Sequence, residues 1–331
     1  MASEQTSNSG GSTLQLLVRQ VRFEGIGINS YELVDPSGAE LPAFTAGAHI
    51  DIHLGDGLVR QYSLCNAPNE RHRYVIAVLR DERGRGGSRA LHERVHVQDI
   101  VRVSRPRNQF QLVDDARRVI LIAGGIGVTP LTSMAHWLED AGIEYEMHYC
   151  AKDADCAALS GELEPMRVNG RVHFHFDGGD PKVGLDIRRL LSEPSHGVHV
   201  YYCGPAGFMQ ACADASAHWP AGTVHFEHFK APERSEPASA ANDVADTFSV
   251  KIASTGQMIE VANDQSIADA LEQAGVAIET SCHAGLCGTC KVRYLSGEVE
   301  HNDCILNDDE KAEFLTACVS RARSKVLVLD L

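Results

Sequence analysis

The sequence is short of several kinds of residue, and each shortage excludes a class of protein. Basic side chains number 30 against 45 acidic ones, and the net charge of −15 argues against nucleic-acid binding, which needs a basic footprint. The most apolar segment, residues 119–128, contains two adjacent glycines and is too short to span a bilayer. The polar first dozen residues contain no signal peptide. We therefore expect a cytoplasmic protein that binds neither nucleic acid nor membrane.

Cysteine, by contrast, is plentiful for a chain without an export signal. Ten cysteines in such a chain are not expected to form a disulfide framework, because disulfides persist mainly in oxidising compartments. Metal binding, or burial of free thiols, is the better expectation.

The pattern of the sequence changes twice along the chain and predicts a multidomain protein. Residues 11–112 alternate short β-type runs with turn signals, which is typical of an antiparallel barrel or sandwich, and we predict the β-barrel. Residues 113–230 alternate apolar strands with helices, which predicts an α/β domain with a parallel sheet. Residues 231–246 contain two prolines and no periodicity, as expected of a linker. Residues 247–331 contain a hairpin, a short helix and further strands, typical of a small α+β domain of the β-grasp type.

A glycine-rich turn, residues 123–130, lies between a strand and a helix in the second region. This is a place where a pyrophosphate is held, and the candidate residues are Gly124, Gly125, Gly127 and Thr129. Thr129 is also predicted to cap the helix, which we expect Gly142 to stop.

The third region holds three closely spaced cysteines, Cys282, Cys287 and Cys290. Their C-x4-C-x2-C spacing is that of plant-type [2Fe–2S] proteins, which need a fourth cysteine further along. Gly285 and Gly288 let the backbone wrap closely around a cluster and adopt positive φ values. A zinc site is disfavoured because only one C-x2-C pair exists, and a buried thiol cluster is the other alternative. Cys304 and Cys318 are both candidates for the fourth ligand.

Two further motifs suit a flavin. The run R-Q-Y-S, residues Arg60, Gln61, Tyr62 and Ser63, resembles the flavin-binding motif of ferredoxin-reductase-like barrels. The Arg60 guanidinium offers a fork to a phosphate, the Tyr62 ring can lie against the isoalloxazine, and the Ser63 hydroxyl can reach flavin N5. A plain strand with a core tyrosine is the alternative. About 20 residues later, a possible phosphate cradle precedes a predicted helix, at Gly86, Gly87 and Ser88.

A second nucleotide motif is the C-G-P element, Cys203, Gly204 and Pro205, which resembles the nicotinamide-proximal motif of the same proteins. Cys203 would lie near nicotinamide C4, or could instead be a small buried residue at a strand end. Asp153 follows the second predicted strand of this region, well before the C-G-P element. A carboxylate there suits a ribose 2′-hydroxyl and repels a 2′-phosphate, which favours NADH over NADPH.

Residues 281–322 resemble the C-terminal ferredoxin domain of the phthalate dioxygenase reductase family, and the order of the three regions extends the resemblance over residues 13–331. It implies that Cys318, after a gap of 27 residues, is the fourth ligand and that Cys304 is a bystander. It also implies FMN rather than FAD, with Phe229 covering the flavin until nicotinamide displaces it, although packing would explain Phe229 equally. The stretch expected to run beside the flavin is Ala77, Val78, Leu79 and Arg80.

The family resemblance implies an NADH-dependent reductase of a Rieske-type terminal oxygenase, either a ring-hydroxylating dioxygenase or an O-demethylase. A flavin between nicotinamide and cluster converts a two-electron delivery into single electrons, so the catalytic residues, Ser63 and Cys203, need no acid–base partner. Two alternatives are an FAD-type reductase serving a haem protein or another ferredoxin, and a non-catalytic iron–sulfur module. The acidic run at residues 307–313 could steer a basic partner or be a solvated helix surface.

Overall fold

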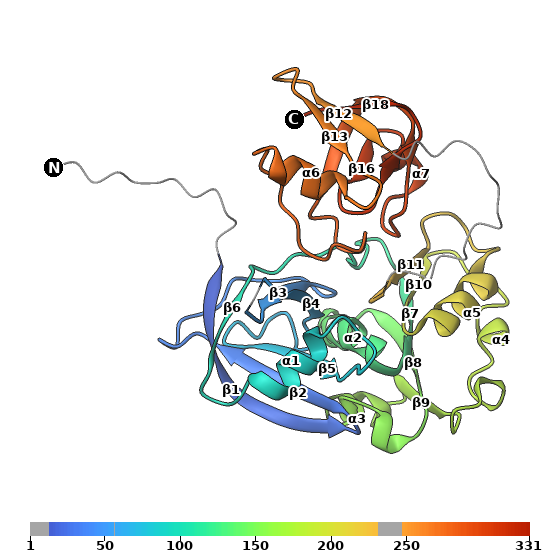
Figure 1. Cartoon of the computed structure of the whole chain (residues 1–331). Helices are drawn as coiled ribbons and strands as arrows, with labels where there is room; N and C mark the ends of the chain where they lie inside the picture. Colours follow the sequence, from blue (N-terminus) through green and yellow to red (C-terminus); the bar gives the residue numbers. More distant parts are fainter. Residues whose placement is uncertain (1–12, 56, 231–246) are drawn as a thin grey trace.

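The computed structural model describes residues 13–55, 57–230 and 247–331, and these form three main sheets (Figure 1). The sheets occupy residues 14–103, 118–227 and 248–329, so each falls inside one predicted region. The boundaries between the regions stay a prediction, and the predicted linker lies outside the described residues. No helix in the described ranges combines the length and apolarity needed to cross a membrane.

The first sheet is an antiparallel barrel in the order β4-β3-β6-β1-β2-β5. A bridge between Leu64 and Ile76 joins the two outer strands, and buried side chains such as Tyr74 and Val103 fill the interior. The strands are β1 (Leu14–Gly25), β2 (Ile28–Val34), β3 (His49–His53), β4 (Val59–Ser63), β5 (Tyr74–Leu79) and β6 (Ile100–Val103), with helix α1 (Gly87–Arg94) before β6. The sequence prediction missed β2, because Asn29, Ser30 and Glu32 interrupt its apolar residues.

The second sheet is parallel, in the order β11-β10-β7-β8-β9. Its strands are β7 (Arg118–Gly124), β8 (Glu144–Ala151), β9 (Val172–Phe176), β10 (Val198–Cys203) and β11 (Val224–Glu227). Helices α2 (Val128–Ala141) and α3 (Ser160–Val168) pack into a core on one face, while α4 (Ile187–Leu190) and α5 (Ala206–Ser216) border a second core on the other. The strand order reverses between β7 and β10, which is where doubly wound sheets bind ligands.

The start of α2 differs from the prediction. A 3₁₀ turn, Gly125–Gly127, precedes the helix, so α2 begins at Val128 and the predicted cap at Thr129 is wrong. The Thr129 hydroxyl instead donates to the Ile126 carbonyl oxygen at 3.1 Å, inside the helical turn. The predicted stop is confirmed, because Gly142 has a φ of 66°.

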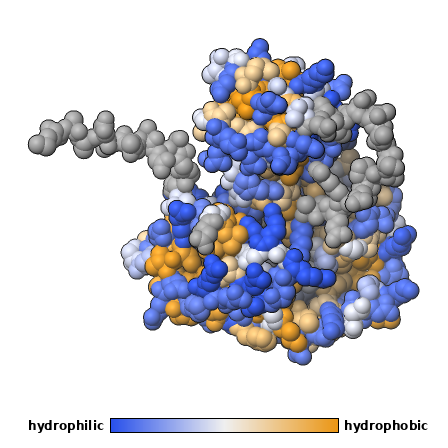
Figure 2. Space-filling view, viewed as in Figure 1, coloured by the Kyte–Doolittle hydropathy of each residue, from blue (hydrophilic) through white to orange (hydrophobic). Residues whose placement is uncertain are grey.

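The third sheet has the order β13-β12-β18-β14-β16, with a separate pair formed by β15 and β17. Its elements are β12 (Phe248–Ile252), β13 (Met258–Val261), α6 (Ile267–Gln273), β14 (Lys291–Ser296), β15 (Val299–Glu300), α7 (Asp308–Lys311), β16 (Phe314–Thr316), β17 (Arg321–Ala322) and β18 (Val326–Leu329). Ser266 and Asp269 form a capping box that starts α6. Figure 1 shows this domain as a separate body above the other two, and hydrophilic residues border much of the junction in Figure 2.

Candidate functional site

The two nucleotide motifs meet at the carboxyl ends of β7 and β10, where the strand order reverses. A Cβ built on Gly127 would lie 2.2 Å from the Cys203 carbonyl oxygen, and one on Gly204 would lie 3.1 Å from the Gly124 Cα atom. Only glycine therefore lets the two loops touch. Gly125 has a φ of 52°, and no described atom lies within 4 Å of its Cβ position, so this turn is open to a ligand. The geometry fits a bound pyrophosphate.

The predicted catalytic residues Ser63 and Cys203 come together around a third side chain, Glu227 at the end of β11. Ser63 Oγ is 3.5 Å from Glu227 Oε2, and Cys203 pairs with Glu227 in the sheet register. Burial raises the pKa of Glu227 to about 8. Burial, and secondarily the charge of Glu227, raises the pKa of the Cys203 thiol, which is neutral at ordinary pH.

Sequence reasoning missed Glu227. Only Phe229, two residues later, is predicted from the sequence to lie at the flavin, although Glu227 ends a strand beside the C-G-P strand. Parallel strands of similar length end at one edge of a sheet, and this could have pointed to Glu227.

The predicted phosphate-cradle residues lie where Arg60 of β4 contacts the start of α1. The Arg60 side chain lies on Gly87, since a Cβ there would be 2.2 Å from an Arg60 carbon, and Arg60 Nη2 donates to the Arg85 carbonyl oxygen at 2.6 Å. Gly86 precedes α1 with a φ of 81°, and none of the described side chains caps the helix. Backbone N–H groups without a side-chain cap, beside a guanidinium, fit a phosphate. Ser88 Oγ accepts from the Asp81 N–H at 3.0 Å.

The other residues predicted at the flavin differ in their burial and in their contacts. Ala77 and Val78 are buried, whereas Leu79 is exposed. The Arg80 guanidinium is paired with Glu82 and Glu93, and the Gln61 side chain contacts Ser281 of the third domain.

Three further predicted site residues lie at the ends of strands or helices of the second domain. Asp153 Oδ1 accepts from the Cys156 N–H at 3.0 Å and caps a 3₁₀ turn, Ala154–Cys156, beyond β8. Phe229 is 37% exposed just beyond β11, as a movable cover requires. Pro205 is the residue before α5.

The four predicted ligand cysteines are all buried. The Cys318 thiol is within hydrogen-bonding reach of Cys282 and Cys290, and Cys287 is within reach of Cys282. The backbone N–H groups of Ala284 and Leu286 each lie 3.4 Å from Cys282 Sγ, which suits a thiolate.

The loop around the cysteines has the backbone that a cluster requires. Gly285 and Gly288 have φ values of 68° and 70°. No three His, Cys, Asp or Glu side chains of the described residues are gathered closely enough to hold one metal ion. A two-iron cluster differs, because its four cysteines are divided between two irons. The Cys304 thiol lies instead beside Asp303 and Lys311.

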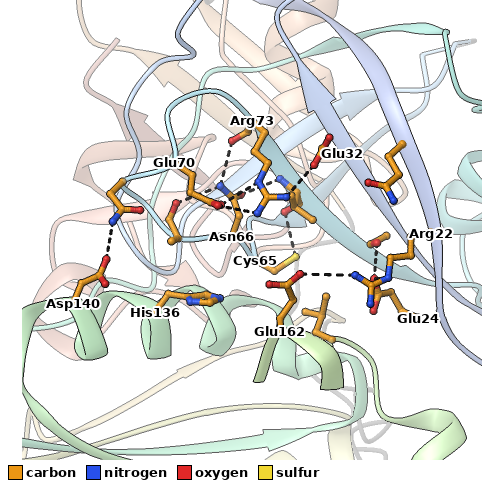
Figure 3. Close-up of a pocket in the computed structure, with 16 residues that line it drawn as sticks. Arg22, Glu24, Glu32, Cys65, Asn66, Glu70, Arg73, His136, Asp140 and Glu162 are labelled. Atoms are coloured by element: carbon orange, nitrogen blue, oxygen red, sulfur yellow. Dashed lines mark hydrogen bonds and ion pairs between the residues drawn. The ribbon is translucent and has the colours of Figure 1, made fainter. Parts of the chain in front are cut away.

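A charged cavity of about 210 Å³ lies between the barrel and helices α2 and α3 (Figure 3). Several of its charges are paired: Arg73 bonds to Glu32 and Glu70, and Arg22 lies 3.9 Å from Glu162. None of the predicted site residues lines this cavity. It therefore lies at the junction of two domains and is separate from the predicted redox site.

Comparisons with known proteins agree with this geometry. A family model described as a 2Fe-2S iron-sulfur cluster binding domain matches residues 250–323. The chain is 54% identical to the tert-butanol monooxygenase / tert-amyl alcohol desaturase reductase subunit of Aquincola tertiaricarbonis, over 97% of this chain and 96% of that protein. It is 46% identical to the vanillate O-demethylase oxidoreductase of Pseudomonas putida, over 92% and 95%.

Among solved structures, the chain is similar to phthalate dioxygenase reductase, described as a modular structure for electron transfer from pyridine nucleotides to [2Fe–2S]. The TM-score is 0.71 and the identity 41%, over 96% of this chain and 98% of that one. The chain belongs to the phthalate dioxygenase reductase family. Membership confirms the predicted family and fold, and the predicted class of an electron-transfer oxidoreductase with a [2Fe–2S] domain.

The chain is also similar to part of a larger enzyme. An intact type IV self-sufficient cytochrome P450 monooxygenase matches with a TM-score of 0.86 and 35% identity, over 99% of this chain and 43% of that one.

Proposed function

We propose that this chain is the NADH-dependent reductase component of an oxygenase system. FMN binds between β4 and α1, and the cluster ligands are Cys282, Cys287, Cys290 and Cys318. The observation that carries the proposal is the contact between Gln61, within the flavin motif, and Ser281, next to the first cluster ligand. Two redox sites that adjoin within one chain suit internal electron transfer.

When bound, FMN supplies a group that takes up a hydride and gives up electrons one at a time. The residues of the barrel hold and orient it. The Arg60 guanidinium and the uncapped start of α1 bind the single phosphate. The largely buried Tyr62 ring lies against the ring system, and the Ser63 hydroxyl faces its reactive edge.

The nicotinamide coenzyme binds at the edge where β7 and β10 end. The open turn at Gly125 takes the pyrophosphate, and Cys203 lies beside the nicotinamide. Phe229 covers the flavin face until the nicotinamide arrives. The Asp153 carboxylate, which accepts from the Cys156 N–H through Oδ1, would face a ribose hydroxyl and favours NADH over NADPH.

The acceptor we propose is a Rieske-type terminal oxygenase. The relatives' names support an oxygenase partner, because they are reductase subunits or oxidoreductases of a monooxygenase and an O-demethylase. Asp308 and Asp309 are exposed on α7, a few residues before Cys318. Acidic side chains beside the cluster would speed encounter with a basic surface.

An anaerobic titration of the purified holoprotein with NADH tests this function. We expect the visible flavin absorbance to bleach and the EPR signal of a reduced [2Fe–2S] cluster to appear, with FMN released on extraction. A colourless preparation made with ample iron and riboflavin would overturn the proposal, and so would flavin bleaching that never reaches the metal.

A second candidate acceptor is a haem protein, which the match to the self-sufficient P450 favours. Parallel assays would measure NADH-dependent reduction of a purified Rieske oxygenase and of a P450 haem domain by this chain. Preferential reduction of the haem, together with FAD on extraction, would favour this candidate.

A further inference from the structure

Two polar connections join the [2Fe–2S] domain to the barrel, and the proposed function uses the first only as a sign that the two redox sites adjoin. The first runs from Gln61 on β4 to Ser281, directly before the first ligand cysteine. The second runs from Arg85, in the loop before α1, to Cys282, because Arg85 Nη1 donates to the Cys282 carbonyl oxygen at 3.2 Å. Both connections end on adjacent residues of the cluster loop.

A buried carboxylate fixes the first connection. Gln61 Nε2 also donates to Asp51 Oδ1 at 2.9 Å, and Arg107 Nη2 lies 2.7 Å from both Asp51 oxygens. Burial alone would raise the pKa of Asp51, but the hydrogen bonds from Arg107, Gln61 and Ser281 outweigh it and lower that pKa. An ionised Asp51 therefore holds Gln61 and the Ser281 hydroxyl in one place.

Strand β4 contributes to both redox sites because side chains alternate along a strand. Arg60 and Tyr62 lie on one face, whereas Gln61 points from the other toward Ser281. Residue Arg85 joins the same two sites, since its carbonyl oxygen accepts from Arg60 while its guanidinium donates to Cys282. Each connection thus ties a flavin-motif residue to the cluster loop.

We propose that Asp51, Gln61, Arg85 and Ser281 form a docking latch that seats the cluster loop against the flavin site. These are positioning residues and take no part in the electron transfer. The inference rests on the proposed function. It adds that the contact between the cluster loop and the flavin site, held by the latch, sets the rate at which electrons reach the cluster.

The test uses three single variants of the full-length holoprotein. Arg85→Gln and Ser281→Ala each remove one connection, and Arg85→Lys keeps a cationic donor. Arg83→Gln is the matched control, because the exposed Arg83 lies in the same loop, donates its backbone N–H to Asp81 and is not one of the latch residues. Flavin and iron contents are measured first, so that a folding failure is recognised.

Two readouts then separate the latch from general damage. In stopped-flow mixing with NADH, we expect flavin reduction to keep its rate in every variant. Cluster reduction should slow about tenfold in Arg85→Gln and Ser281→Ala, as for loss of one good hydrogen bond, and recover at least in part in Arg85→Lys. Hydrogen exchange of the barrel loop at residues 81–86 and of the cluster loop should rise only in the first two variants.

Two results would overturn the latch. One is cluster reduction at the parent rate in Arg85→Gln and Ser281→Ala, and the other is equal slowing in Arg83→Gln. Failure of the proposed function looks different, because the parent protein itself would then lack flavin or never reduce its cluster with NADH.

Discussion

Gly127 and Cys203 lie in direct contact, with no room for a side chain between the glycine-rich turn and the C-G-P strand end. A Cβ on Gly127 would meet the Cys203 carbonyl oxygen at 2.2 Å and the Gly204 nitrogen at 2.7 Å. Because these atoms are backbone, they cannot rotate away. The close approach of the two loops at this edge of the parallel sheet therefore requires glycine at position 127.

Gly127→Ala should push the two loops apart and weaken NADH binding. We expect the dissociation constant to rise about tenfold or more, as for steric disruption costing above 1.4 kcal/mol, with flavin content unchanged. Titration of the oxidised protein with NAD⁺ or a non-reducing analogue measures it. Gly207→Ala is the control, because beyond the neighbouring residues and backbone of its own helix no described atom lies within 4 Å of that Cβ position, and alanine favours a helix. Equal affinities in the two variants would contradict the steric argument.

Cys318→Ser should abolish the cluster, whereas Cys304→Ser should retain it. The Cys318 sulfur faces Cys282 and Cys290, while the Cys304 thiol lies beside Asp303. Iron content and the visible and EPR spectra of each purified variant measure the outcome. A Cys304→Ser protein without iron would show that the ligand assignment is wrong.

Glu227→Gln should change how stability depends on pH. The folded pKa of Glu227, about 8, lies above the unfolded value of about 4.3. The folded state therefore binds more protons between these values, and the stability of the parent falls as pH rises through this window. Glutamine stays neutral and removes this loss.

We expect the variant to gain about 2 kcal/mol relative to the parent between pH 5 and pH 8, after discounting the full shift for the partial exposure of the side chain. Urea unfolding of the holoprotein at both pH values measures the difference. The exposed Glu193, changed to Gln, serves as control. A variant-to-parent difference that is the same at pH 5 and pH 8 would show that Glu227 is not buried as a neutral acid.

Arg73→Met should destabilise the barrel beside the charged cavity. Arg73 donates to Glu32 at 2.9 Å and to Glu70 at 2.8 Å, and the Glu32 side chain is 10% exposed. Burial alone would raise the pKa of Glu32, yet the bonds from Arg19 and Arg73 lower it, so the variant leaves a buried charge with one partner fewer. We expect a loss of about 2–3 kcal/mol in the free energy of unfolding.

Arg167→Met provides the matched comparison for Arg73. Arg167 also bonds to a glutamate, Glu164, but both side chains are about half exposed. Water screens such a pair, so thermal unfolding should show no measurable change. If both arginine variants lost the same stability, burial of Glu32 would not be the cause.

Local patterns of residues along the sequence made much of the fold predictable. The change from alternating strands to strand–helix units separated the barrel from the parallel sheet, and the stop at Gly142 followed from its left-handed backbone. Strand β2 was missed because its polar residues mask its apolar pattern. The start of α2 was misplaced because the 3₁₀ turn at Gly125–Gly127 continues into the helix without a side-chain cap.

The sequence by itself determined the cofactor chemistry of this protein, because cysteine spacing and glycine-rich turns are local requirements of a cluster and of phosphates. Only the tertiary structure decided which side chains meet across domains. Glu227 reaches Ser63, and Gln61 reaches Ser281, over separations of 164 and 220 residues. No local pattern records such contacts, because they arise from how the three sheets pack against one another.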